Sequence, residues 1–518
     1  MAKLPRLYWL VPCLLAGCLA VGGCSAGGDE TGGGVTGGGG GKGGAGGKGG
    51  GTGVGGARGG TTGTGGGGGV GLINFDGGKA VNPTDKVDLF FVIDNSLSMA
   101  DKQQILADSV PDMIQRMATP DCISLADNTT RVGQSTIDGV CPAGSKLEFL
   151  PMKDIHIGVT SSSLGGHGAP ICRPGVANYN PTQMDMSHLL DRGPSGTVPT
   201  FQDKKFLQWD AGNRYGGDTD LAGIQGKFAD LVRGVGEIGC GYEAPLEATY
   251  RFLMDPSPYD SIDTSGNPVG VDQTILTERA AFLRPDSELA MFTITDENDC
   301  SVWDDGTTGY WIVLKYTAIT RATSQCKTNP NDPCCQPCKA ANPNMNCNPK
   351  VANDPECMIN GGLYTTGQPE DQANLRCFHQ KQRFGVDFLW PVSRYINGAT
   401  GPTVPDRAQG NAMVTNPIYA GGMRSPDMVF WVGIVGVPWQ DLAKDPADLK
   451  KGLLDTKCAA GLTSCKDFIT EGRWGMILGD PSASPPVLPT DNLMVESVAP
   501  RMGMHPLITG GAIQPPTA

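Results

Sequence analysis

The chain has 518 residues, including 76 glycines and 17 cysteines, and its formal net charge is −13. The length allows two or three average domains, or one elaborated α/β domain with flanking segments. Five cations and two anions precede residue 72, so the remainder carries 35 basic and 51 acidic side chains, a charge of −16. Such an acidic surface excludes nucleic acid as an expected partner and disfavours anionic lipid head groups, whereas it suits divalent cations.

Residues 1–24 have the pattern of a secretory signal, because Lys3 and Arg6 precede a glycine-interrupted apolar run that is too short for a membrane span. Two stretches, LAGC ending at Cys18 and VGGC ending at Cys24, resemble the lipobox of bacterial lipoproteins. The resemblance implies cleavage before the cysteine and a diacylglycerol on its sulfur. LAGC fits the lipobox better, but cleavage before Cys24 leaves a longer apolar core, and we favour Cys24. The alternative is a plain secretory signal or an uncleaved anchor.

Residues 25–71 are mostly glycine without any other periodicity, which predicts a disordered tether. A random coil of these 47 residues has an end-to-end distance of about 40 Å. Such a tether would let a folded head stand off from a lipid anchor. We expect the folded domain at 72–450 and a C-terminal extension packed on it at 451–518.

From residue 86 onward, strand-like and helix-like segments alternate, which predicts an α/β fold with a mostly parallel central sheet and helices on both faces. The expected strands lie within 86–94, 154–163, 204–210, 287–299 and 426–437. The expected helices are 101–117, with Pro111 as a kink, 225–235, 244–254 and 383–396. Long turn-rich insertions separate these elements.

The cysteines beyond the signal number 14, an even count that favours disulfides in an exported chain. Seven of them fall in an insertion at about 301–380, and because seven is odd, at least one pairs outside the insertion, links another chain or stays free. The CCQPC stretch (334–338) also allows a zinc knuckle, but no second clean Cys-x-x-Cys follows it. We therefore favour disulfides over zinc.

Two of the expected strands end in acidic, hydroxyl-rich turns. The first is followed by Asp94, Ser96 and Ser98, and the fourth by Thr295 and Asp296. Ligand sites of parallel sheets form at the carboxyl ends of strands, so these oxygens converge if the two strands are neighbours. Hard oxygens at this density suit Mg²⁺. The alternative is that the aspartate and the serines only cap a helix.

With VDLFFVIDNSLSM before a helix and FTITDENDCS later, the chain resembles the von Willebrand factor A domain and its metal-ion-dependent adhesion site. The resemblance covers the main sheet elements between about residues 85 and 440, with disulfide-rich insertions. It implies a Rossmann-like sheet, a bound Mg²⁺ (or Mn²⁺ or Ca²⁺), and a protein ligand that completes the coordination with an acidic side chain. The positions that match the signature are Asp94, Ser96, Ser98 and Asp296.

The sequence departs from the family at the threonine that an intervening loop usually supplies. The corresponding stretch, GEIGCGYEAPLEA, has Cys240 or Glu243 in this neighbourhood, and Glu243 is the better oxygen donor. A third carboxylate would reduce the electrophilicity of the cation. Cys240 and Cys300 fall in the two loops expected to flank the site, which suggests a disulfide between them, although either cysteine could pair elsewhere. Glu297 and Asp299 are expected to be solvated loop charges.

No catalytic set can be assembled from the sequence, and we expect no enzyme. The five histidines lack metal-ligand spacing, and there is no HExxH or GxSxG motif. The leading interpretation is a lipid-anchored protein of the bacterial cell envelope, on the outer membrane or cell surface, whose metal-binding head adheres to a protein or surface partner. The alternative is a structural envelope lipoprotein in which the metal only stabilises the fold and the insertions make the contacts.

Overall fold

The computed structural model describes one main body of the chain. The described residues are 84–128, 130–263, 265–304, 318–365, 370–372, 375–448, 451–454 and 467–495, with two short strands at 503–504 and 512–513. The expected signal peptide, Cys18, Cys24 and the glycine-rich tether lie outside them. Within the described residues, no helix is long and apolar enough to cross a membrane.

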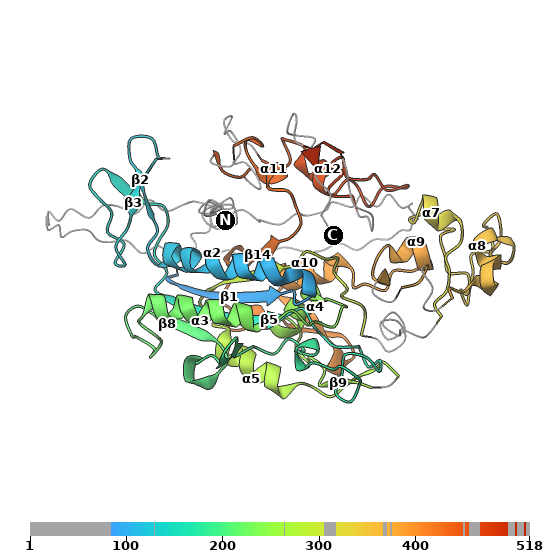
Figure 1. Cartoon of the computed structure of the whole chain (residues 1–518), viewed down its shortest axis with the longest axis horizontal. Coiled ribbons are helices and arrows are strands. Elements are labelled where there is room, and N and C mark those ends of the chain that lie inside the picture. Colours follow the sequence, from blue (N-terminus) through green and yellow to red (C-terminus); the bar gives the residue numbers. More distant parts are fainter. Residues whose placement is uncertain are drawn as a thin grey trace, which may run out of the picture. The chain divides into compact units, whose positions relative to one another are not determined.

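A mixed, mostly parallel sheet of five strands organises this body (Figure 1). Its order is β14 (Val429–Ile434), β11 (Glu288–Ile294), β1 (Lys86–Ile93), β5 (Asp154–Ser161) and β8 (Leu207–Asp210). The first four strands are parallel, and β8 runs antiparallel to β5. The α/β class and the position of each strand agree with the prediction from sequence.

Helices cover both faces of the sheet. On one face, α2 (Ala100–Ala118) and α3 (Leu221–Gly234) lie side by side (Figure 1). On the other face are α4 (Pro245–Leu253), α5 (Gln273–Phe282) and α10 (Val392–Thr400). Helix α5 is not among the helices expected from the sequence.

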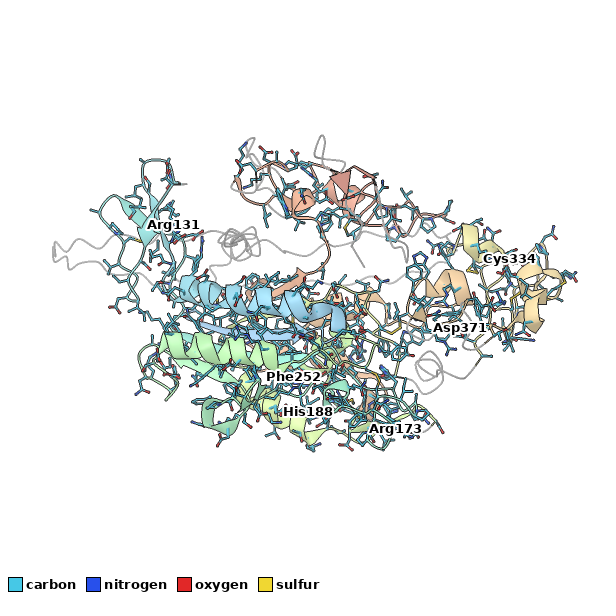
Figure 2. All side chains as sticks on the ribbon, viewed as in Figure 1. Arg131, Arg173, His188, Phe252, Cys334 and Asp371 are labelled. Carbon is cyan, nitrogen blue, oxygen red and sulfur yellow. A yellow bond between two sulfur atoms is a disulfide. The ribbon has the colours of Figure 1, made fainter. Side chains whose placement is uncertain are left out.

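Apart from Lys86 and Asp88, the central strand β1 is apolar, because its alternate side chains enter two different cores. Phe91 points to the α2 and α3 side, where its ring stacks on Phe292 at a centroid distance of 4.5 Å. Phe90 points to the other side and stacks on Phe252 at 4.7 Å, and Figure 2 labels Phe252 on α4. A continuous apolar run is therefore the expected signature of this strand.

A buried ion-pair network closes the amino-terminal end of the sheet. Asp88, fully buried in β1, accepts hydrogen bonds from Arg284 Nε at 2.8 Å and from Arg424 Nη2 at 3.2 Å, and the Ser287 hydroxyl donates to it as well. These contacts join β1 to segments about 200 and 340 residues later along the chain. The network thus fixes the ends of three chain segments against one carboxylate.

The remaining elements are short and lie in the insertions or near the C-terminus. They are β2 (Asp121–Ser124), β3 (Arg131–Gln134), β4 (Ser145–Leu147), β6 (Arg192–Gly193), β7 (Gly196–Thr197), β9 (Ser261–Ile262), β10 (Pro268–Val269), β12 (Thr403–Asp406), β13 (Ala412–Thr415), β15 (Gly503–Met504), β16 (Ala512–Ile513), α7 (Gln325–Thr328), α8 (Pro355–Met358), α9 (Gln380–Phe384), α11 (Trp439–Leu442) and α12 (Arg473–Ile477). Near the C-terminus, Leu454, Phe468 and Ile477 form a small core of their own.

The helix expected at 383–396 is in fact two helices, α9 and α10. Gly385 ends α9 with a φ of 75°, and a Cβ at this position would lie 2.3 Å from the backbone of Gln336. Pro391 then precedes α10, where its fixed φ suits the entry to a helix. Glycine and proline therefore interrupted a pattern of apolar spacing that looked continuous.

Six disulfides join the described cysteines. Three lie inside the insertion, Cys326–Cys335, Cys334–Cys347 and Cys338–Cys357, and Figure 2 labels Cys334 there. The seventh cysteine of the insertion, Cys377, pairs with Cys300 outside it. The odd count is thereby explained by pairing outside the insertion, and the three sulfurs of CCQPC form disulfides, so they do not act as zinc thiolates.

Candidate functional site

The carboxyl ends of β1 and β11 meet, as expected for the case in which the two strands are neighbours. The two strands are parallel neighbours, with Ile93 opposite Ile294 at the end of the register. The amide of Asp94 continues the ladder by donating to the carbonyl of Ile294 at 2.8 Å. Asp94 and Asp296, about 200 residues apart in sequence, therefore leave the sheet at the same edge.

A continuous run of polar contacts connects the predicted residues. The backbone N–H of Ser96 donates to Asp94 Oδ1 at 2.8 Å, which orients this buried carboxylate. The Ser96 and Ser98 hydroxyl oxygens are 2.9 Å apart, and the Ser98 hydroxyl donates to Asp296 Oδ1 at 3.0 Å. The structure thus brings together all four residues that match the signature.

The serine hydroxyls do not act as helix caps. Ser96 precedes the short 3-10 turn Leu97–Met99, and Met99 precedes α2, but neither position makes a side-chain capping hydrogen bond. The hydroxyls instead face each other and the carboxylate of Asp296. The capping alternative is therefore wrong for these two serines.

Thr295 is a site residue that the sequence analysis did not assign. Its hydroxyl donates to the second carboxylate oxygen of Asp94, Oδ2, at 2.7 Å. Both oxygens of Asp94 are thus held by donors from the two strand ends. The signal was available, because Thr295 is the first residue after β11 and directly precedes Asp296.

Glu243 lies beside this cluster, and its carboxyl group is buried. Burial, together with repulsion from Glu297 and Asp94, raises the pKa of Glu243 to about 8. The amide of Gly241 donates to its Oε1 at 3.1 Å. Burial also raises the pKa of Asp94, partly offset by the hydrogen bonds from Thr295 and Ser96. Negative charge is therefore crowded at this edge of the sheet.

The two neighbouring loop acids have different surroundings. Glu297 is exposed, as expected, although partial burial of its carboxyl group and repulsion from Asp94 raise its pKa. Asp299 is not a solvated charge, since its Oδ1 accepts from the amide of Leu246 and the hydroxyl of Ser301. Asp299 thus anchors the start of α4 rather than the cation site.

Lys102 is a second residue that the sequence analysis did not assign. From the first turn of α2, its ammonium group lies 3.0 Å from Asp296 Oδ2 and 3.0 Å from Asp101 Oδ1. It also donates to the carbonyl of Ser98 at 2.9 Å, the i, i+4 spacing that a helix brings together. Burial lowers the pKa of Lys102, but the two carboxylates overcome this effect and raise it.

Loops behind the site hold it in place. Asn95 donates through its Nδ2 to the carbonyl of Thr182 at 2.9 Å, and the Ser163 hydroxyl donates to Asn95 Oδ1 at 2.8 Å. The amide of Cys240 in turn donates to the same hydroxyl at 3.1 Å. The Cys240 loop is therefore connected to the residue that follows Asp94.

The predicted disulfide between Cys240 and Cys300 is wrong. Cys240 pairs with Cys172, which follows β5, and Cys300 pairs with Cys377. The two loops are neighbours nevertheless, because the amide of Cys300 donates to the carbonyl of Glu243 at 2.7 Å. A backbone hydrogen bond therefore joins the two loops, and each cysteine forms its disulfide with a different segment of the chain.

Across the described part of the chain, no group of three or more His, Cys, Asp or Glu side chains is arranged to hold a metal ion. The cluster described above differs from such a group because half of the signature oxygens are serine hydroxyls. In comparisons with known proteins, no family model matches the chain, and no curated protein or solved structure matches it either.

Proposed function

We propose that the body built on the five-stranded sheet is a von Willebrand factor A type domain that binds a divalent cation and, through it, a protein or surface partner. The observation that carries the proposal is the run of oxygens from Asp94 through Ser96 and Ser98 to Asp296. It lies at the carboxyl edge of a mostly parallel sheet, where such folds bind their ligands.

The distances within the run fit a small octahedral ion. Neighbouring ligands of Mg²⁺, each 2.0 to 2.1 Å from the metal, are about 2.9 Å apart. The Ser96 and Ser98 hydroxyl oxygens are 2.9 Å apart, and Ser98 Oγ lies 3.0 Å from Asp296 Oδ1. An ion bound by these oxygens would replace the hydrogen bonds between them, and Mn²⁺ or Ca²⁺ could substitute for Mg²⁺.

The donor set favours an ion that keeps an open position. Hydroxyls carry no charge, so a cation held by two serines and two carboxylates remains electron-poor enough to take an acidic side chain of a partner. Thr295 and the Ser96 amide would not contact the ion themselves. They donate hydrogen bonds to Asp94 and so fix the orientation of its carboxylate. Glu243 is the nearest substitute for the missing threonine.

The proposal includes attachment to a bacterial cell envelope. A lipid on Cys24 or Cys18 would anchor the chain, and residues 25–71 would separate the anchor from the head. The partner would then be an envelope or surface component within reach of the tether. The alternative role, a structural lipoprotein, makes the opposite prediction for metal removal.

Binding of Mn²⁺ to the full chain, stripped with EDTA and followed by electron paramagnetic resonance, tests the cation site. We expect Asp94→Ala to abolish binding and Asp286→Ala to retain it, because Asp286 lies two residues before β11, at the end of the strand opposite to the site. Pull-down from envelope extracts with Mg²⁺ or EDTA tests the partner. Capture that persists in EDTA while the melting temperature falls would favour the structural role.

A further inference from the structure

We infer that Lys102 is a built-in competitor of the divalent cation, an ammonium group that occupies the Asp296 carboxylate until the metal displaces it. The inference rests on the proposed cation site and adds a means of regulating it.

The contacts of Lys102 place a positive charge on a carboxylate that the ion would have to share. Its Nζ is 3.0 Å from Asp296 Oδ2, while Ser98 Oγ is 3.0 Å from the other oxygen, Oδ1, of the same carboxylate. The ammonium also bonds the carbonyl of Ser98 at 2.9 Å. A metal ion and an ammonium sharing one carboxylate lie within a few ångströms and repel each other.

The displaced ammonium has a place to go. The Lys102 side chain is 43% exposed on a flexible four-carbon stem, so it can swing toward solvent at small cost. It also has a second partner, because Asp101 Oδ1 lies 3.0 Å from Nζ and its side chain is 73% exposed. Lys102 can therefore release Asp296 while it keeps its contact with Asp101. It then remains close enough to return when the metal leaves.

The consequence is a weaker and more selective metal site. Because the ion must remove an ammonium group, the apparent affinity is lower than the oxygens alone would give. A divalent ion can compete with the ammonium, whereas a monovalent ion brings no more charge than Lys102 itself. Charge exchange of this kind would keep the negative cluster neutralised when metal is scarce.

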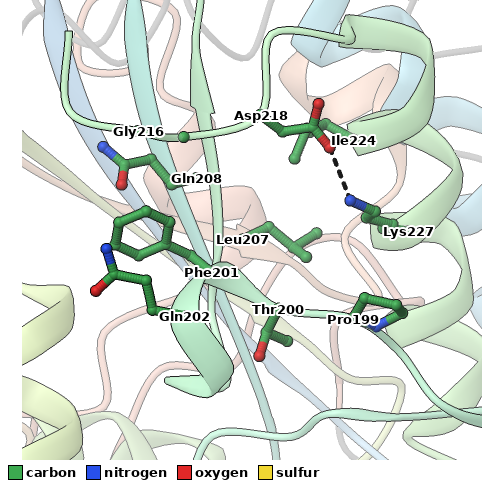
Figure 3. A pocket seen from close by; sticks show the side chains of 11 residues that line it. Pro199, Thr200, Phe201, Gln202, Leu207, Gln208, Gly216, Asp218, Ile224 and Lys227 are labelled. Carbon is green, nitrogen blue, oxygen red and sulfur yellow. Dashed lines mark hydrogen bonds and ion pairs between the residues drawn. The ribbon is translucent and has the colours of Figure 1, made fainter. Parts of the chain in front are cut away.

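Lys102→Met in the full chain tests the inference, with Lys227→Met as the matched control. Lys227 lies on α3 beside β8, where its ammonium is 2.7 Å from Asp218 (Figure 3). Both changes remove one ion-paired lysine and one positive charge. We expect Lys102→Met to lower the dissociation constant for Mn²⁺ about tenfold and Lys227→Met to leave it unchanged.

Acetylation of lysines in the unmodified full chain, read by mass spectrometry, provides a second measurement that does not depend on a variant. Mg²⁺ should speed the labelling of Lys102 relative to EDTA and leave Lys227 unaffected. If Mn²⁺ binds the wild-type protein, but binds Lys102→Met equally well or Mg²⁺ leaves Lys102 labelling unchanged, the inference is overturned and the cation site stands. If neither protein binds Mn²⁺, both the cation site and the inference are overturned.

Discussion

His188 provides the clearest pH-dependent contribution to stability. Its Nε2 lies 3.1 Å from Asp272 Oδ2 and its Nδ1 3.6 Å from Glu278 Oε2, and Figure 2 labels His188 beside α5. Asp272 caps α5, and Glu278 belongs to the same helix. Protonated His188 therefore ties the loop after β5 to α5.

The pKa of His188 gives the sign and the magnitude of its contribution to the free energy of unfolding. Burial alone would lower the pKa of His188, but the two carboxylates overcome it and raise the pKa from 6.5 to about 9. The stabilisation is therefore complete below pH 6.5 and is lost as the pH rises through 9. The difference between the folded and the ordinary pKa corresponds to about 3 kcal/mol of stability, at about 1.4 kcal/mol per pKa unit. Because the ring is 29% exposed, solvent screening reduces this to about 2 kcal/mol.

We expect His188→Gln to destabilise the protein by about 2 kcal/mol at pH 6 and by little at pH 10. Thermal unfolding of wild type and variant at both pH values measures this, with an expected difference in melting temperature of about 3 °C at pH 6. The comparison of two proteins at each pH cancels all other titrating groups. An equal loss at both pH values would show that His188 acts through packing and would refute the ion-pair argument.

Three further variants test other parts of the structure. Glu243→Gln should stabilise the metal-free protein at pH 9 and not at pH 4.5, because a raised carboxyl pKa makes ionisation costly only above its unfolded value; melting in EDTA at both values checks this. Arg424→Met should cost about 3 kcal/mol in urea unfolding, since it removes a buried partner of Asp88. The double change Cys172→Ser and Cys240→Ser should cost about 2 to 4 kcal/mol by the same measurement, and no loss would contradict a structural role for this disulfide.

Sequence reasoning predicted the central sheet well because burial on both faces leaves an unmistakable pattern. The run from Lys86 to Ile93 is apolar at almost every position, and the sheet makes it the central strand. The meeting of Asp94 and Asp296 followed from the same reasoning, since parallel neighbours end at one edge. The meeting still depended on β1 and β11 being neighbours, and the strand order of the sheet confirms this condition.

The errors arose where long-range contacts decide between local alternatives. Cys240 and Cys300 are neighbours, but the paths of two insertions select Cys172 and Cys377 as their partners. The 383–396 segment keeps its apolar spacing across Gly385, yet the backbone of Gln336 lies too close for a helix with side chains there. The spacing of residues along the chain predicts neither these disulfide partners nor the approach of Gln336 to Gly385.

The loop with Cys240 and Glu243 lacks the threonine found in the family that the chain resembles, and contacts on several sides hold this loop in place. Cys240 is joined to Cys172 and to the hydroxyl of Ser163, and the carbonyl of Glu243 accepts from the amide of Cys300. Because three contacts hold the loop, Glu243 keeps one position. The effect of Glu243 on the proposed site therefore depends on whether its carboxyl group is ionised. In the proposed site, an ionised Glu243 would offset the positive charge of the cation and weaken its hold on an acidic partner. A protonated Glu243 would leave that charge available, because it carries no charge of its own.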